Sequence, residues 1–170
     1  HLIRLDYAEK VTSREFRLRL PFNLLDIWDE PDSFVGRNFT KGYAGFLGDP
    51  LDLACLVQKA AQKESISLAF TQWIAAWLRH PFTEPPLVSA YVSRIPDAST
   101  LKELGLREVR EGGKLWLHVP EDEGIFLETQ TCQRLTLTTD AQIYLDLQNC
   151  GLRAPEAGDA LRGWEGFCKP

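Results

Sequence analysis

The sequence of 170 residues contains no methionine and little histidine or cysteine, with 3 histidines and 4 cysteines. No apolar run approaches the ~20 residues that a membrane-spanning helix requires, and no signal-peptide pattern opens the chain. We therefore expect a cytoplasmic protein without a membrane segment. Because methionine is missing and the chain begins with His1, we also expect it to be a piece of a longer protein.

The cysteines and histidines are too scattered to form a familiar metal or redox motif. A zinc ribbon or a thioredoxin-like site needs two cysteines within one turn, and the chain has no C-x-x-C pair. The sequence therefore predicts reduced thiols, no bound metal and no cofactor. The residues concerned are Cys55, Cys132, Cys150 and Cys168, together with His1, His80 and His118.

The composition is that of an ordinary globular protein. Charged residues make up 25% of the chain and hydrophobic residues 44%, which argues against disorder, collagen or coiled coil as whole-chain descriptions. A chain of this length can bury one core, so we predict a single domain over residues 1–170. The formal net charge is −5, and phosphate affinity depends mainly on Lys and Arg, so we do not expect this stretch to wrap nucleic acid by itself.

In the first half of the chain, the apolar pattern alternates between strand and helix periods. It predicts a lead-in strand within residues 1–21, a short helix over 24–29, and one or two strands over 37–46 with a turn at Lys41-Gly42. Asp49 followed by Pro50 is typical of a helix start. A second helix, capped by Ser65, would follow directly and form an αα-hairpin with the first.

The second half has more strand character. The pattern predicts strands over 87–92, 107–110, 115–119, 125–129 and 134–137, and helices over 99–104, 141–149 and 155–164. Interspersed strands and helices indicate an α+β or α/β fold. We predict a mixed β-sheet covered by helices, with the αα-hairpin in the middle and two helices at the C-terminal end.

Few patterns in the sequence indicate catalysis. There is no P-loop and no G-x-S-x-G, H-E-x-x-H or G-x-G-x-x-G motif. Asp49 and Asp52 follow a glycine turn, and two such carboxylates can hold Mg²⁺, which leaves a nucleotidyltransferase-like enzyme as an alternative. The simpler interpretation is that Asp49 caps a helix and Asp52 favours its positive first turn.

An acidic run, Glu121-Asp122-Glu123, is the strongest local concentration of one charge. It could bind a cation or a basic partner, or it could be the solvated tip of a hairpin. An oligomerising module with an unknown small ligand is a further alternative for the chain as a whole.

The last forty residues contain the most distinctive pattern. In the run Gln142 to Leu147, Ile143, Tyr144 and Leu147 lie at the spacing of a buried helical stripe. Asp146 and Arg153 bracket the following turn and could pair across it, and Glu156 lies in the first turn of the closing helix. We predict that Tyr144, Asp146, Arg153 and Glu156 have structural or partner-contact roles.

This pattern resembles the C-terminal signature of the AbiEi-type antitoxins, transcriptional regulators of bacterial type IV toxin–antitoxin systems. In that family a Q-L-Y-L-D-L helix is followed by a glycine, an arginine and an E-A-A…L-R helix, as in residues 142–162 here. Shorter matches at 24–28, 75–76, 104–106 and 120–126 occur in the same order, so the resemblance covers about residues 22–165. The chain departs from the family pattern at Gly158, where the family tends to have a small helix former such as alanine. It also departs at Cys150-Gly151-Leu152, which replaces a more basic, glycine-rich turn.

The resemblance implies a non-enzymatic antitoxin or regulator effector domain. Family members join such a domain to an N-terminal winged helix that binds operator DNA, and no winged helix is recognisable in this chain. They are thought to repress their own operon and to counter a nucleotidyltransferase-like toxin without a tight complex. The resemblance transfers no catalytic residue and leaves a homo-oligomer possible.

Overall fold

The computed structural model describes residues 1–19, 21–29, 34, 36–46, 48–148, 150–151 and 153–169. The chain divides into two compact units, residues 1–32 and 33–170. The first unit has a small two-stranded sheet of its own. Among the described residues, no helix has the length and apolar character needed to cross a membrane.

The first unit is a hairpin followed by a helix. Strands β1 (Ala8–Lys10) and β2 (Phe16–Leu18) pair antiparallel, and α1 spans Pro21–Asp29. The guanidinium of Arg19 lies 2.6 Å from the carboxylate of Asp6. The lead-in strand predicted within residues 1–21 is therefore two short strands, because the chain turns back on itself between them.

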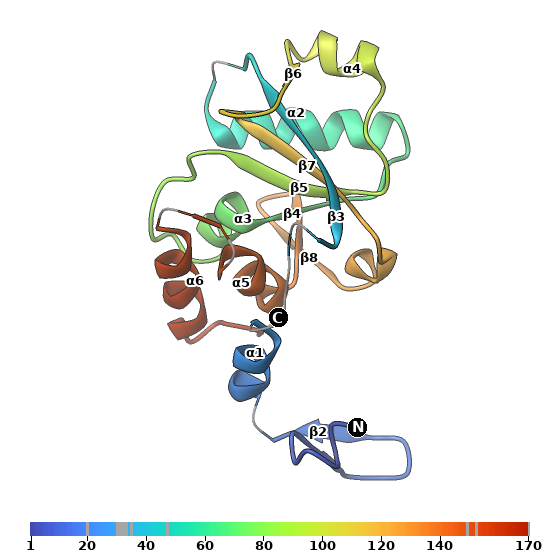
Figure 1. Ribbon diagram of the computed structural model, residues 1–170, viewed down its shortest axis with the longest axis vertical. Helices are drawn as coiled ribbons and strands as arrows, with labels where there is room; N and C mark the ends of the chain where they lie inside the picture. Colours follow the sequence, from blue (N-terminus) through green and yellow to red (C-terminus); the bar gives the residue numbers. More distant parts are fainter. Residues whose placement is uncertain are drawn as a thin grey trace. The chain divides into compact units, whose positions relative to one another are not determined.

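The second unit is built on a seven-stranded mixed sheet with the order β6-β3-β7-β5-β4-β9-β8 (Figure 1). The β5–β7 and β4–β9 pairs are parallel, and the other neighbouring pairs are antiparallel. The strands are β3 (Asn38–Ala44), β4 (Leu68–Thr71), β5 (Val88–Val92), β6 (Arg107–Val109), β7 (Leu115–Pro120), β8 (Thr129–Cys132) and β9 (Leu135–Thr138). This confirms the α+β class and the mixed sheet.

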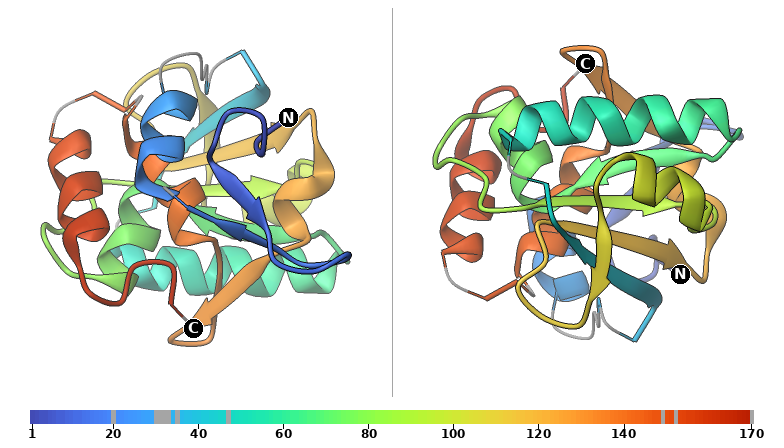
Figure 2. Two further views of the ribbon diagram at one scale, coloured as in Figure 1. Left: turned by 90° about the horizontal axis from the view of Figure 1, so that it is seen from below. Right: turned by 90° about the horizontal axis from the view of Figure 1, so that it is seen from above.

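Helices cover both faces of this sheet. Helix α2 contacts β4, β5 and β9, whereas α5 contacts β4 and packs against α3 and α6. The two views of Figure 2 show α2 on one side of the sheet and α5 on the other. The helical elements of this unit are α2 (Pro50–Lys63), α3 (Gln72–Arg79), α4 (Ala98–Glu103), the 3₁₀ helix η1 (Glu123–Phe126), α5 (Asp140–Gln148) and α6 (Ala154–Gly163).

The start of α2 follows the sequence prediction, and its end explains why the predicted αα-hairpin is wrong. The Asp49 carboxylate accepts a hydrogen bond of 2.7 Å from the Leu51 N–H, and Pro50 begins the helix. Ser65 has a φ of 54°, and the Ile66 N–H bonds the Ala61 carbonyl at 2.8 Å. Ser65 therefore closes α2, as the residue after the cap commonly does, and does not open a second helix.

The segment after Ser65 is strand β4, which separates α2 from α3. Leu68–Thr71 pairs with β5 on one side and with β9 on the other. Pairing on both sides at the centre of a sheet outweighs the helix preference of a short apolar segment. Helix α3 begins only at Gln72, whose φ is 53°.

Two further local predictions are wrong. Of the one or two strands predicted over 37–46, the structure has one, β3, so the turn proposed at Lys41-Gly42 is absent and β6 and β7 pair with the strand on either side. In the predicted strand over 125–129, only Thr129 is in a strand, β8, whereas Ile125 and Phe126 end η1. The Asp122 carboxylate accepts from the Gly124 N–H at 2.8 Å and starts this tight turn. The predicted end of the helix at Asn149 lies outside the described residues.

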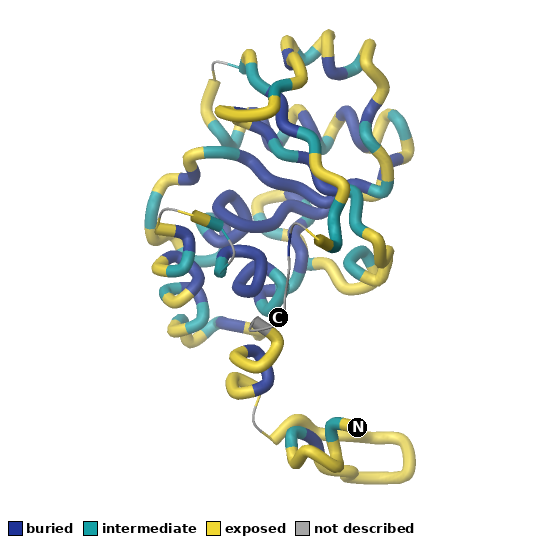
Figure 3. Tube along the Cα trace, in the orientation of Figure 1, coloured by how far each residue is buried: buried dark blue, intermediate teal, exposed yellow. Residues whose placement is uncertain are grey.

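The core lies along the central strands, where burial is nearly continuous (Figure 3). Every residue of β5 is buried. Helices α3 and α5 bury most of their side chains, including Trp73, Ile143 and Leu147. Strands buried on both faces tolerate polar side chains only where these are hydrogen-bonded. The hydrogen bonds of the polar residues in this core therefore bear directly on its stability.

We expect Gly42→Ala to lower the free energy of unfolding by about 1–3 kcal/mol. A Cβ atom at Gly42 would lie 2.8 Å from the Trp116 ring and 3.0 Å from the Val109 carbonyl oxygen of β6, so the ring and the β3–β6 pairing would have to shift. Gly163→Ala is the control, because a Cβ there meets nothing within 4 Å. Denaturant unfolding of both variants tests this, and equal stability of the two would contradict the close packing at Gly42.

Candidate functional site

One face of the sheet carries a row of buried polar side chains. The strand register places Thr40 opposite His118, His118 opposite Tyr91, and Ser89 opposite Thr71. Residues directly opposite each other point to the same face, so these side chains share one face of β3, β7, β5 and β4. This is the face that meets α5, since Thr71 and Tyr91 both contact Asp146 of that helix.

The Asp146 carboxylate is the centre of this polar layer and is fully buried. Its Oδ2 accepts from the Thr71 hydroxyl at 2.5 Å. Its Oδ1 accepts from the guanidinium of Arg37 at 2.8 Å, the amide of Gln142 at 2.7 Å and the hydroxyl of Tyr91 at 3.0 Å. We call Asp146, Arg37, Thr71, Tyr91 and Gln142 the Asp146 cluster.

Burial and hydrogen bonding act in opposite directions on the protonation of this cluster. Burial raises the pKa of Asp146 to about 6, although the Thr71 hydroxyl, the Arg37 charge and the other donors favour the ionised form. Burial and the nearby carboxylate also raise the pKa of Tyr91 far above its ordinary value. Tyr91 therefore remains a neutral hydrogen-bond donor to Asp146.

His118 lies next to this cluster and is almost completely buried. Its Nδ1 is 2.9 Å from the Thr40 hydroxyl, and its ring meets the Phe34 ring edge-on at a centroid distance of 4.7 Å. Its Nε2 is buried and has no hydrogen-bond partner among the described residues. Burial and the Arg37 charge lower the pKa of His118 to about 3, so the imidazole is neutral near pH 7.

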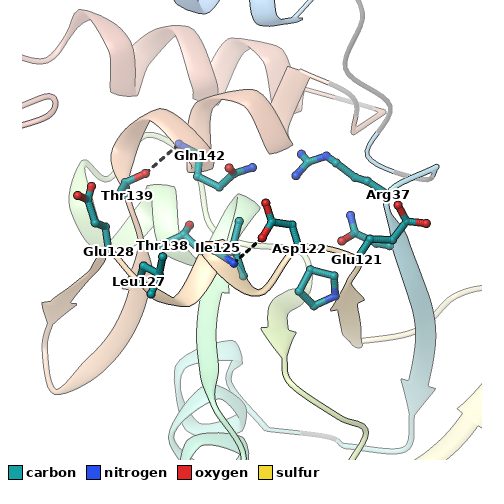
Figure 4. Close-up of a pocket in the computed structure, with 12 residues that line it drawn as sticks. Arg37, Glu121, Asp122, Ile125, Leu127, Glu128, Thr138, Thr139 and Gln142 are labelled. Atoms are coloured by element: carbon teal, nitrogen blue, oxygen red, sulfur yellow. Dashed lines mark hydrogen bonds between the residues drawn. The ribbon is translucent and has the colours of Figure 1, made fainter.

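A cavity of about 560 Å³ opens beside the Asp146 cluster. Figure 4 shows the Arg37 guanidinium and the Gln142 amide directed toward each other, with the Asp122 carboxylate below them. Arg37 and Gln142 thus line the cavity and also bind the buried carboxylate. The lining residues are Arg37, Asn38, Pro120, Glu121, Asp122, Gly124, Ile125, Leu127, Glu128, Thr138, Thr139 and Gln142.

The structure brings only part of the predicted motif together. Asp146 and Tyr144 are buried, and the Tyr144 hydroxyl accepts from Arg162 of α6 at 2.9 Å. Arg153 and Glu156 form an exposed ion pair at 2.6 Å. The predicted pairing of Asp146 with Arg153 is wrong, because Asp146 is inside the fold and bonds Arg37, whereas Arg153 is at the surface.

Close packing between α5 and α6 explains why a glycine occupies position 158. A Cβ at Gly158 would lie 2.7 Å from the Gln148 side chain and 3.5 Å from both Leu147 and Tyr144. The glycine therefore lets α6 approach α5 closely at this point. Leu152, in the turn before α6, lies outside the described residues.

The two carboxylates considered for metal binding, those of Asp49 and Asp52, lie at the start of a helix. Asp49 caps α2, and Asp52 lies in the first turn of that helix. Within the described part of the chain, no group of three or more His, Cys, Asp or Glu side chains is placed to hold a metal ion. The two carboxylates are therefore explained by the positive end of α2.

Sequence reasoning missed Arg37, Thr71, Tyr91 and His118. The only available signal was a polar residue in the middle of an apolar strand, as with Tyr91 in Val88–Val92 and His118 in Leu115–Pro120. Such a residue needs a buried partner. The partner itself lies far along the chain, since Arg37 and Asp146 are 109 positions apart.

We expect Asp146→Ala to destabilise the protein by about 3–5 kcal/mol, because it leaves the Arg37 charge and the neighbouring donors without their acceptor. Asp159→Ala removes an exposed carboxylate from α6 and should change the stability by no more than about 0.5 kcal/mol. Denaturant unfolding measures both effects. A loss below about 1 kcal/mol for Asp146→Ala would contradict the central role of this carboxylate.

His118 should make the protein sensitive to acid. The pKa of about 3 in the folded protein is below the ordinary 6.5, so the unfolded chain binds the proton more readily between these values. The His118 contribution to stability is therefore complete above pH 6.5 and falls by about 1.4 kcal/mol for each pH unit below it.

His118→Asn retains a polar group near Thr40 and removes this titration. We expect the unfolding free energy of the variant to fall less steeply than that of the original protein between pH 6.5 and pH 4.5. Identical slopes in urea unfolding measured across this range would show that His118 does not control the acid response.

Comparison with protein-family models, with curated proteins and with solved structures gives no match for this chain. The functional interpretation therefore depends on the residues and geometry described above.

Proposed function

We propose that the chain is the effector domain of a bacterial antitoxin-type transcriptional regulator, joined in the complete protein to a separate DNA-binding domain. The observation that carries the proposal is the position of the resembling signature at the centre of the fold. Its aspartate, Asp146, is the buried acceptor that connects α5 to β4, β5 and Arg37. Its tyrosine, Tyr144, connects α5 to α6.

These contacts give the signature a structural role in the proposed regulator domain. A buried carboxylate with several donors tolerates few substitutions, so its sequence context marks a shared fold. The exposed members of the signature, Arg153 and Glu156, are the ones available to a partner. The proposal therefore assigns structural roles to Tyr144 and Asp146 and a contact role to Arg153 and Glu156.

The net charge of the chain is consistent with operator binding by a separate domain. With a net charge of −5, this chain would leave operator binding to another domain. In this proposal, the domain counters a nucleotidyltransferase-like toxin encoded beside it, without a tight complex and without chemistry of its own.

The test is co-expression of the complete gene with the neighbouring toxin gene in a bacterial host. We expect the antitoxin gene to restore growth, and Arg153→Ala to reduce the number of surviving colonies at least about tenfold. Loss of an exposed ion pair changes stability by about 0–1 kcal/mol, so this variant should still fold. Asp159→Ala, also exposed on α6, is the matched control and should rescue fully.

Absence of rescue by a soluble, folded protein would overturn the proposed function. Full rescue by Arg153→Ala would leave the regulator function standing and would remove the contact role of the exposed pair.

A further inference from the structure

The cavity beside the Asp146 cluster is not explained by the proposed antitoxin role. Its volume of about 560 Å³ is in the range of sites that hold small organic molecules. Three separate segments form it: the start of β3, the loop from Pro120 to Glu128, and the junction between β9 and α5. The acidic run of the sequence is thus part of the wall of a concave site.

The charges around this cavity favour a cation. Glu121, Asp122 and Glu128 line it, and none of them has an ion-pair partner in the described part of the chain. The cationic lining residue, Arg37, lies 2.8 Å from the buried Asp146 carboxylate, which offsets its charge. The acidic side chains therefore dominate the local potential.

The uncharged groups of the cavity also favour a ligand that donates hydrogen bonds. The Asn38 amide nitrogen donates to the Phe34 carbonyl at 2.6 Å. The Asn38 carbonyl oxygen is buried and has no hydrogen-bond partner among the described residues.

Apolar side chains lie between these polar groups. Ile125 and Pro120 line the cavity, and Leu127, at 86% exposure, leaves most of its surface uncovered. Such a surface can pack against the methylene groups of a flexible chain. Acceptors separated by apolar surface match a molecule whose amines are separated by methylenes.

We propose that this cavity binds a small organic cation with two or more protonated amines joined by methylene segments, the chemistry of a polyamine. The amines are held by Glu121, Asp122 and Glu128, and the methylenes pack on Ile125 and Leu127. This binding is a property of the domain and does not depend on its role in toxin control. A hydrated metal ion fits this set less well, because it would leave the apolar surface uncovered.

Arg37 and Gln142 connect the cavity to the interior. Both line the ligand space, and both donate to Asp146. A bound cation would therefore lie beside Arg37 and Gln142, whose hydrogen bonds to Asp146 also hold α5 on the sheet. Ligand binding should therefore stabilise the folded form of the whole unit.

The experiment is isothermal titration of the full chain with spermidine at low ionic strength. 1,4-Butanediol serves as the uncharged control ligand. We expect spermidine to bind with a Kd in the range of about 10 µM to 1 mM, and the diol to give no binding. Added salt should weaken the binding, since it screens exposed charges.

Two variants each neutralise three carboxylates, one variant in the cavity and the other outside it. The cavity variant is Glu121→Gln, Asp122→Asn and Glu128→Gln together, in which Asp122→Asn retains an oxygen for the Gly124 N–H. The control variant is Glu111→Gln, Asp159→Asn and Glu165→Gln, which neutralises exposed carboxylates outside the cavity. We expect at least tenfold weaker binding in the first variant and less than twofold change in the second.

Three results would overturn the proposal. The first is no spermidine binding up to about 10 mM, and the second is an equal loss in both variants, which indicates non-specific attraction by the net charge. The third is displacement of spermidine by equimolar Mg²⁺, which indicates a metal site. Thermal unfolding of the cavity variant verifies that it is folded before titration.

Discussion

The burial of one carboxylate, that of Asp146, constrains the larger unit of this protein more than any other interaction described. Removing a carboxylate from water is so unfavourable that it persists only when strong donors surround it. Here the donors come from the last residue of β4, from β5, from the residue before β3 and from the preceding turn of α5. These elements must all be in place before the carboxylate is satisfied, so one side chain fixes their arrangement.

Helix α5 carries a second buried carboxylate with a similar effect on the end of the chain. Asp140 pairs in a bidentate manner with Arg79 of α3, at 2.8 Å and 3.0 Å, and also accepts from Gln130 of β8 and from the Cys168 N–H. The same Arg79 lies over the Trp164 ring. The two carboxylates, six positions apart on one helix, thus attach α5 to the sheet, to α3 and to the C-terminal segment.

Local chemistry made part of this fold predictable. Asp49 and Pro50 specify the start of α2 through a cap and a missing N–H, and these effects need no tertiary contact. The strand β4 was not predictable in this way, because four residues between two helical patterns become a strand only when β5 and β9 lie on either side. The same limit applies to the site. The sequence singled out Asp146, but its partner Arg37 is remote in the chain and has no pattern that distinguishes it from any other surface arginine.

The long sequence separations in this structure also have a consequence for how the protein is made. Strand β4 needs β9, which lies more than sixty positions later, and Arg37 needs Asp146, which is 109 positions away. Contacts of this kind form slowly, and a ribosome delivers the early partner first. The larger unit therefore completes its central pairing only after nearly the whole chain has been synthesised, and until then the edge of β4 that pairs with β9 stays open to other strands.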